Sequence, residues 1–267
     1  MRTIFIQELK MNIKSLLYWL LGMVLLIAVA IAEYSTVVGG DGAQSMMPML
    51  MAMPKIVRVM FNMNAVSIDT PLGYFACMFL WYEFVAYAHA AFLGASIVAK
   101  EERDRTADYI FTKPYSRSTV MSAKVLVCLV SMVVLNIVTW TSSAVAFGHP
   151  KGFDPIQREI AFLMLGMLLV QVIFFALGLL LSAVTRTQKS ASSFALLAVL
   201  AGYAAGVAVE YAEKSSVWDY LTPFRYFYAA GVAEDGMRIS CIGLSLVLCV
   251  IFMIAAYLIY NRRDLQV

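Results

Sequence analysis

Residues 73–99 read GYFACMFLWYEFVAYAHAAFLGASIVA, and residues 100–124 continue as KEERDRTADYIFTKPYSRSTVMSAK. The first part is almost wholly apolar and long enough to cross the hydrocarbon core of a bilayer as one helix. The second part holds ten Lys, Arg, Asp or Glu residues, although only 14% of the whole chain is charged. This change of character predicts a membrane-spanning helix that leads directly into a segment in water.

The composition extends this prediction to the whole chain. With 62% hydrophobic residues and a mean hydropathy of +0.79, the chain is far too apolar for a soluble domain of 267 residues. We expect an all-α, polytopic membrane protein that forms one transmembrane domain, residues 1–267. Six apolar runs are each long enough to be a span: residues 16–38, 73–99, 122–147, 159–184, 190–210 and 239–260.

The orientation of these spans follows from the distribution of Lys and Arg. If both termini are cytoplasmic, thirteen of the twenty Lys and Arg residues lie inside and seven lie outside, which is the bias that membrane proteins show. We therefore expect both termini, and the segment 100–121, in the cytoplasm. Residues 1–15 are amphipathic and are predicted to form a helix in the inner interface, with a simple extension of the first span as the alternative.

Two outer regions have unusual compositions. The segment 39–72 holds seven methionines between Met46 and Met63, which favours a short interfacial helix, with binding of a soft metal ion as the alternative. The segment 211–237 is rich in aromatic residues, which are typical of a belt at the membrane interface; gating of a substrate is the alternative. These aromatic residues are Trp218, Tyr220, Phe224, Tyr226, Phe227 and Tyr228.

Motifs for catalysis are missing from the sequence. It has no GxxxxGK[ST] phosphate loop, no HExxH and no GxSxG, and its two histidines, His89 and His149, are far apart. The four cysteines have no metal-ligand spacing. We therefore expect no catalytic residue, no metal site and no cofactor in this chain, so that it is not an enzyme.

Glu83 lies near the middle of the second predicted span. Helical spacing places Glu83, Ala86, Ala90 and Gly94 on one stripe, with Tyr87 beside it. A carboxylate at this depth is costly and small residues allow close helix contact, so this face is predicted to meet protein. Two interpretations stay open: Glu83 and Tyr87 line a translocation path, or Glu83 is a hydrogen-bonded packing residue.

The segment 100–121 has the features of a docking surface. Acidic residues extend the preceding helix, an apolar triplet follows at Tyr109, Ile110 and Phe111, and Pro114 ends the helical phase. A solvated linker would not need the apolar triplet, although such a linker is the alternative.

The same segment resembles the signature of type-2 ABC transporter permeases. That signature has an acidic pair, a Gly-Thr, a Pro-x-Ser-Arg and a following Lys between the second and third spans. Arg105 departs from it, because the family has Gly before the Thr. The residues that carry the resemblance are Glu101, Glu102, Thr106, Phe111, Thr112, Lys113, Pro114, Tyr115, Ser116, Arg117 and Lys124, together with residues 54–73, Thr222, Pro223, Phe224 and residues 262–265.

This resemblance, which covers nearly the whole chain, implies a permease subunit without its own motor. Two permease copies, identical or paired with a sister chain, would recruit two cytoplasmic ABC ATPase subunits that bind ATP and Mg. The implied setting is a bacterial plasma membrane, with no nucleic acid as partner. The residues implied to couple to the ATPase are Glu101, Glu102, Thr106, Tyr109, Ile110, Phe111, Lys113, Pro114 and Arg117.

Small permeases of this kind often export peptide antibiotics or other amphipathic compounds and so confer antibiotic resistance. We therefore expect export of such a compound. The alternatives are a permease that extrudes a cation or metal, with Glu83 as the cation site, and a membrane assembly or sensory factor that transports nothing.

Overall fold

The computed structural model describes residues 2–37, 48–49, 52–63, 68, 70–97, 117–147, 156–185, 187–213 and 217–262, and the regular secondary structure within these ranges is helical, with no strand. Six helices are long and apolar enough to cross a membrane. This confirms the predicted all-α, six-span architecture. The six are α1 (Arg2–Val37), α4 (Pro71–Ser96), α7 (Arg117–Phe147), α8 (Gln157–Val184), α9 (Gln188–Tyr211) and α11 (Ile239–Arg262).

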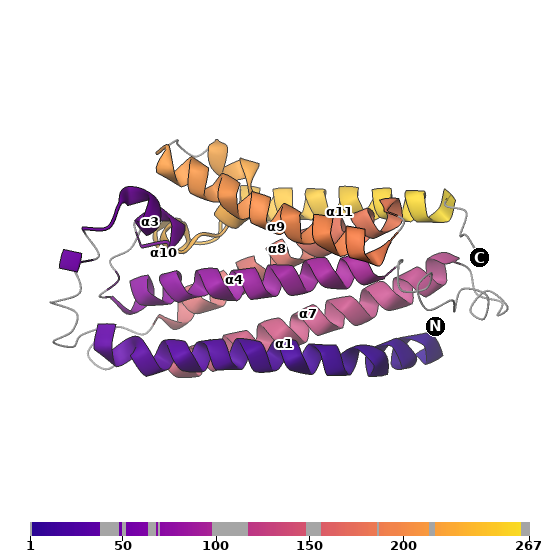
Figure 1. Cartoon of the computed structure of the whole chain (residues 1–267), viewed down its shortest axis with the longest axis horizontal. Coiled ribbons are helices and arrows are strands. Elements are labelled where there is room, and N and C mark those ends of the chain that lie inside the picture. Colours follow the sequence, from indigo (N-terminus) through magenta and orange to yellow (C-terminus); the bar gives the residue numbers. More distant parts are fainter. Residues whose placement is uncertain are drawn as a thin grey trace.

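In the part of the chain that the structure describes, shorter elements connect these helices: α3 (Lys55–Met60), η1 (Trp218–Leu221), η2 (Pro223–Arg225) and α10 (Ala229–Asp235). Figure 1 shows α3 and α10 at one end of the bundle, whereas the start of α1 and the end of α11 lie at the other end. An even number of spans places both termini on one side. The assignment of that side to the cytoplasm stays a prediction.

The predicted boundary between residues 1–15 and the first span is not a break in the structure. α1 runs unbroken from Arg2 to Val37, so the alternative of a simple extension describes its backbone. The reason is local, because no Pro or Gly occurs before Gly22 to interrupt the backbone hydrogen bonds. The position of residues 1–15 in the membrane interface stays a prediction.

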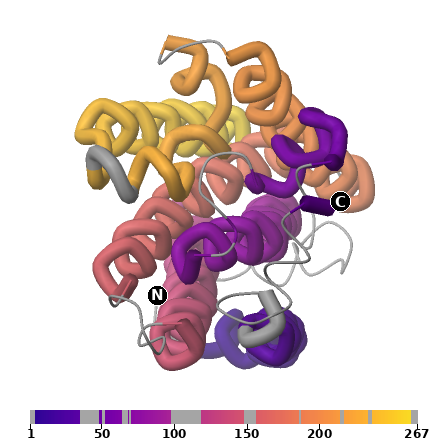
Figure 2. The backbone as a smooth tube through the Cα atoms, turned by 90° about the vertical axis from the view of Figure 1, so that its left-hand side faces the viewer, coloured from indigo at the N-terminus to yellow at the C-terminus, as the bar shows by residue number. Residues whose placement is uncertain are grey.

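The bundle has a core pair of helices and two flanks. α4 and α8 pack on each other over the most extensive interface and occupy the middle, with α1 and α7 on one side and α9 and α11 on the other (Figure 2). α1, α9 and α11 bury few of their apolar side chains and leave many of them exposed. Exposed apolar faces of this kind suit contact with lipid or with another transmembrane subunit.

The close approach of α4 to α8 depends on two glycines. A Cβ on Gly94 would lie 2.2 Å from the carbonyl oxygen of Phe175, and a Cβ on Gly178 would lie 2.4 Å from that of Ala91. Ala86 and Ala90, on the same stripe of α4, are fully buried. The prediction that this stripe meets protein is therefore confirmed.

Candidate functional site: a polar pocket under a re-entrant loop

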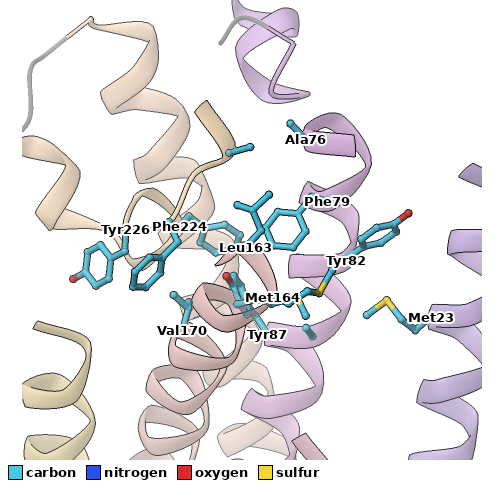
Figure 3. Close-up of a cluster of buried hydrophobic side chains, with 14 of the residues drawn as sticks. Met23, Ala76, Phe79, Tyr82, Tyr87, Leu163, Met164, Val170, Phe224 and Tyr226 are labelled. Carbon is cyan, nitrogen blue, oxygen red and sulfur yellow. The ribbon is translucent and has the colours of Figure 1, made fainter. Parts of the chain in front are cut away.

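The chain between α9 and α11 folds back into the helix bundle. Phe224, Tyr226 and Phe227 are at most 7% exposed, and Figure 3 shows Phe224 and Tyr226 among the side chains of the buried cluster. The prediction that they form an interface belt is therefore wrong for these three residues. It failed because their rings are buried by neighbouring helices of the same chain. Trp218 and Tyr220, by contrast, stay exposed.

Phe224 is the centre of an aromatic cluster. Four rings from three different helices lie within 6 Å of its ring, measured between centroids: Phe84 at 5.5 Å, Tyr87 at 5.0 Å, Phe174 at 5.9 Å and Tyr203 at 5.8 Å. Edge-to-face pairs of this kind add to the free energy that burial of the rings supplies. The loop is thus held by packing against α4, α8 and α9.

Gly166 of α8 makes room for this loop, because a Cβ there would lie 2.5 Å from Phe227 Cβ. A Cβ on Gly206 of α9 would lie at an ordinary contact distance, 3.6 Å, from Phe224 Cβ. Thr222 Oγ1 donates a hydrogen bond of 2.6 Å to the carbonyl of Gly202. The Gly202-xxx-Gly206 motif is typical of helix–helix packing, but here it receives a loop of its own chain.

The same loop carries a network of charged side chains that connects it to α9. Arg225 Nη1 donates to Glu210 Oε2 at 2.7 Å, and Arg225 Nε donates to Asp219 Oδ1 at 3.0 Å. Arg238 Nη1 reaches the other oxygen of Asp219 at 3.3 Å. The Tyr228 ring contacts both guanidinium groups, with its centroid 4.3 Å from Arg225 Cζ and 5.6 Å from Arg238 Cζ. Such cation–π contacts hold the two arginines in place.

A hydroxyl in the same loop is also buried. Tyr226 Oη donates to the carbonyl of Tyr220 at 3.2 Å. Burial of the phenol raises the pKa of Tyr226 to about 12, with a smaller contribution from the nearby Cys241. This phenol therefore stays neutral at physiological pH and acts as a hydrogen-bond donor that fixes the loop.

Under the loop lies a pocket of about 40 Å³, which is room for a few water molecules. It is bounded by α3, α4, α9 and the chain from η2 to α10. Its walls are aromatic and apolar, and its polar groups carry both signs of charge. The polar lining residues are Asn62, Glu83, Tyr203, Glu210, Arg225 and Tyr228.

Of the two residues predicted for a translocation path, Glu83 lines this pocket and Tyr87 contacts Glu83. Tyr87 Oη donates to Glu83 Oε1 at 2.8 Å, one helical turn away on α4. The ring of Tyr87 packs edge-to-face against Phe224, which also lines the pocket. Their role in a translocation path stays a prediction.

The predicted coupling residues lie almost wholly outside the described residues. Residues 98–116 contain eight of the nine: Glu101, Glu102, Thr106, Tyr109, Ile110, Phe111, Lys113 and Pro114. The ninth, Arg117, is the first residue of α7. The structure therefore describes the two helices that this segment joins, whose ends lie with the termini at one end of the bundle (Figure 1).

The ion-pair network was not predicted from the sequence. Glu210, Asp219, Arg225 and Arg238 are separated by up to 28 positions. Arg225 and Arg238 were counted only as outer charges, and Glu210 was placed in the predicted span 190–210. A signal existed, since two acidic residues and two arginines stand in or directly beside the aromatic-rich segment 211–237. Their pairing depends on the loop turning inward, which a one-dimensional pattern does not show.

The chain matches a known family over nearly its whole length. The family model described as "ABC-2 family transporter protein" matches residues 2–265. The chain belongs to the ABC-2 transporter family. No curated protein matches it significantly. An ABC-2 permease is a membrane transport subunit that generally lacks its own ATPase, so a partner ATPase and a membrane setting follow from the family.

Within the ABC-2 permease, the described residues contain no group of three or more His, Cys, Asp or Glu side chains arranged to hold a metal ion. The pocket's carboxylates, Glu83 and Glu210, share their site with the guanidinium of Arg225. The pocket therefore offers the hydrogen-bonded carboxyl group of Glu83, the guanidinium of Arg225 and the faces of aromatic rings. These are the groups that bind an amphipathic molecule with polar or charged substituents.

Proposed function

We propose that this ABC-2 permease is the membrane subunit of an ATP-driven exporter that moves an amphipathic compound, such as a peptide antibiotic, out of a bacterial cell. One observation supports this most directly. The pocket beneath η2 combines the walls of Phe79, Tyr203 and Phe224 with Glu83 and Arg225. An apolar site with a few convergent charged groups suits an amphipathic ligand.

The pocket is too small for such a compound when η2 is in place. About 40 Å³ holds only a few water molecules, whereas pockets for drug-sized ligands measure roughly 300–1,000 Å³. We therefore propose that the structure is a closed state. In transport, η2 and Phe224 would move away from α4 and α9 and open the pocket toward the end that carries α3 and α10.

The motor for this movement is proposed to dock on the segment 100–121. In the proposal, Tyr109, Ile110 and Phe111 bury against the ATPase, while the charged residues around them set its orientation. Two ATPase subunits would serve two permease copies, either identical or paired with a sister chain. The support for this site is its position between α4 and α7 together with the missing phosphate loop.

The decisive experiment uses the permease copurified with its ATPase and reconstituted into lipid. ATP hydrolysis is measured while peptides, lipids and metal cations are added separately. Stimulation by amphipathic peptides is the expected result. Stimulation by a cation alone would favour the cation-extrusion alternative, and a complex that responds to nothing would favour an assembly or sensory factor.

Docking has its own test in Phe111→Asp combined with Lys113→Glu. These changes place a charge in the proposed apolar contact and reverse a charge beside it, so the ATPase should no longer copurify. Val217→Asp is the matched control, because Val217 is an exposed apolar residue in the loop between α9 and α11. A complex that survives both changes would show that the segment is not the docking site.

A further inference from the structure

Lys124 connects three helices at the end of the bundle that carries both termini. Its Nζ lies 3.5 Å from Glu8 Oε1 on α1 and 3.5 Å from the carbonyl oxygen of Ile97, the C-cap of α4. Lys124 itself lies on α7. The junction of Glu8, Lys124 and Ile97 therefore joins α1, α4 and α7 through one ammonium group.

This junction is largely shielded from water. The side chains of Lys124 and Glu8 are only 7% and 12% exposed, and the neighbouring Val120, Met121 and Ala123 are buried. An exposed ion pair contributes little because water and salt screen it. A shielded pair differs, since loss of one partner leaves the other charge without solvation. The junction thus favours one defined arrangement of the three helices.

The junction also lies close to both ends of the segment 98–116. Ile97 directly precedes that segment, and Arg117, which directly follows it, lies seven residues before Lys124. At a rise of about 1.5 Å per residue, Lys124 is roughly 10 Å along α7 from the segment. A displacement of the segment would therefore reach this junction from α4 and from α7.

Of the three helices, α1 depends most on this junction for its position in the bundle. It packs mainly on α7, makes a smaller contact with α4, and leaves many of its apolar side chains exposed. Apolar contacts are non-directional and allow a helix to slide or rotate on its neighbour. A charged contact with a fixed partner sets the register between the two helices.

We propose that Glu8 and Lys124 are positioning residues that transmit movement of the segment 98–116 to α1 while the ATPase works. The inference rests on the proposed function, because it requires an ATPase that drives that segment. Neither residue is proposed to touch ATP or the transported compound. Without the junction, the segment would still move α4 and α7, but α1 would not follow.

The test is a double-mutant cycle in the reconstituted complex with its ATPase. Glu8→Gln, Lys124→Gln and the double variant are compared by the amount of bound ATPase, by basal ATP hydrolysis and by transport per ATP hydrolysed. We expect bound ATPase and basal hydrolysis to stay unchanged, while transport per ATP falls about tenfold in each single variant. The double variant should lose no more than either single one, since both changes break the same contact.

Two controls separate coupling from stability. Lys124→Arg keeps the charge and should retain transport per ATP. Lys10→Gln and Lys14→Gln remove exposed cations from the same end of α1 and should change nothing. If a single variant does not assemble, the neutral double variant is decisive, and it must then show the tenfold loss.

Unchanged transport per ATP in the single variants, or additive losses in the double variant, would overturn the inference. A loss of transport per ATP that occurs only in variants that release the ATPase would also overturn the inference. A wild-type complex that binds no ATPase, or that no substrate stimulates, would instead contradict the proposed function, and the inference would fall with it. The wild-type and variant measurements therefore distinguish the two failures.

Discussion

Arg225 donates a hydrogen bond of 2.7 Å to Glu210 and so ties η2 to the last turn of α9. Both side chains are less than a fifth exposed, and Asp219 accepts a second bond from the same guanidinium. One side chain thus connects the re-entrant loop to a spanning helix on one side and to η1 on the other. We therefore expect this contact to stabilise the loop over the pocket.

Arg225→Gln should therefore destabilise the loop, because it leaves Glu210 and Asp219 as partly buried carboxylates with less compensation. We expect a loss of about 3 kcal/mol in the free energy of unfolding, the order found when a buried ion pair loses one partner. Thermal unfolding in lipid nanodiscs measures it. Lys55→Gln, which removes a cation from an ion pair with the exposed Glu213, is the control and should have a clearly smaller effect. Equal effects would contradict the assignment of Arg225 as the main tie.

Gly94→Ala should separate α4 from α8, since the added Cβ would lie 2.2 Å from the carbonyl oxygen of Phe175. Overpacking of this kind costs about 1–3 kcal/mol, and backbone on both sides leaves little room to relax. Unfolding of the purified permease reports the loss. Gly22→Ala is the matched control on α1, where no atom lies within 4 Å of the added Cβ. Comparable stability of the two variants would show that the crossing is looser than the structure indicates.

Phe224→Ala should empty the centre of the aromatic cluster and enlarge the pocket. Loss of a buried phenylalanine costs about 3–5 kcal/mol where the site does not collapse. A cysteine placed at Val207, which lines the pocket, should react faster with a membrane-impermeant thiol reagent in this variant. Trp218→Ala, at a position 47% exposed, should leave that rate unchanged. No increase after Phe224→Ala would mean that Phe224 does not close the pocket.

Glu83→Gln should reduce transport by about tenfold without reducing assembly, because the amide can still accept the hydrogen bond from Tyr87 but can neither exchange a proton nor pair with a cation. Transport and ATPase copurification are measured on the same preparation. Glu33→Gln, which neutralises an exposed carboxylate on α1, should be silent. Unchanged transport in Glu83→Gln would remove Glu83 from the mechanism and leave the packing interpretation.

The contact of α3 with the end of α9 should depend on pH. Lys55 donates to Glu213, and this hydrogen bond, followed by the ammonium charge, lowers the pKa of Glu213. A carboxyl group whose pKa is lower in the folded than in the unfolded state stabilises the fold at pH values above its unfolded-state pKa, about 4.3. This stabilisation is lost as the pH falls through the folded-state pKa. Hydrogen exchange of α3, corrected for its intrinsic pH dependence, should therefore accelerate below a pH of about 4. Lys55→Met should remove this acceleration; if it persists, another group is responsible.

The spans were predictable because each depends on local composition. A bilayer requires about twenty apolar residues for a helix, so the runs around Glu83 or Met164 identify their helices without a neighbour. Boundaries differed by a few residues, as for α4, which begins at Pro71 because Thr70 caps it by accepting a hydrogen bond from Gly73 N. The contact between Glu83 and Tyr87 was also predictable, because residues four positions apart share a helix face.

The amino-acid sequence by itself thus determined the class, the six spans and the stripe of α4 that meets protein, since all of these follow from the periodicity and length of single helices. Only the tertiary structure decided that Phe224 turns inward, that Arg225 meets Glu210, and that Lys124 joins α1 to α4. These contacts link positions 15 to 116 residues apart or reverse the direction that composition favours. Their physical reason is packing, because a ring or charge goes where another helix leaves space or a partner, and that is settled only when the helices are assembled.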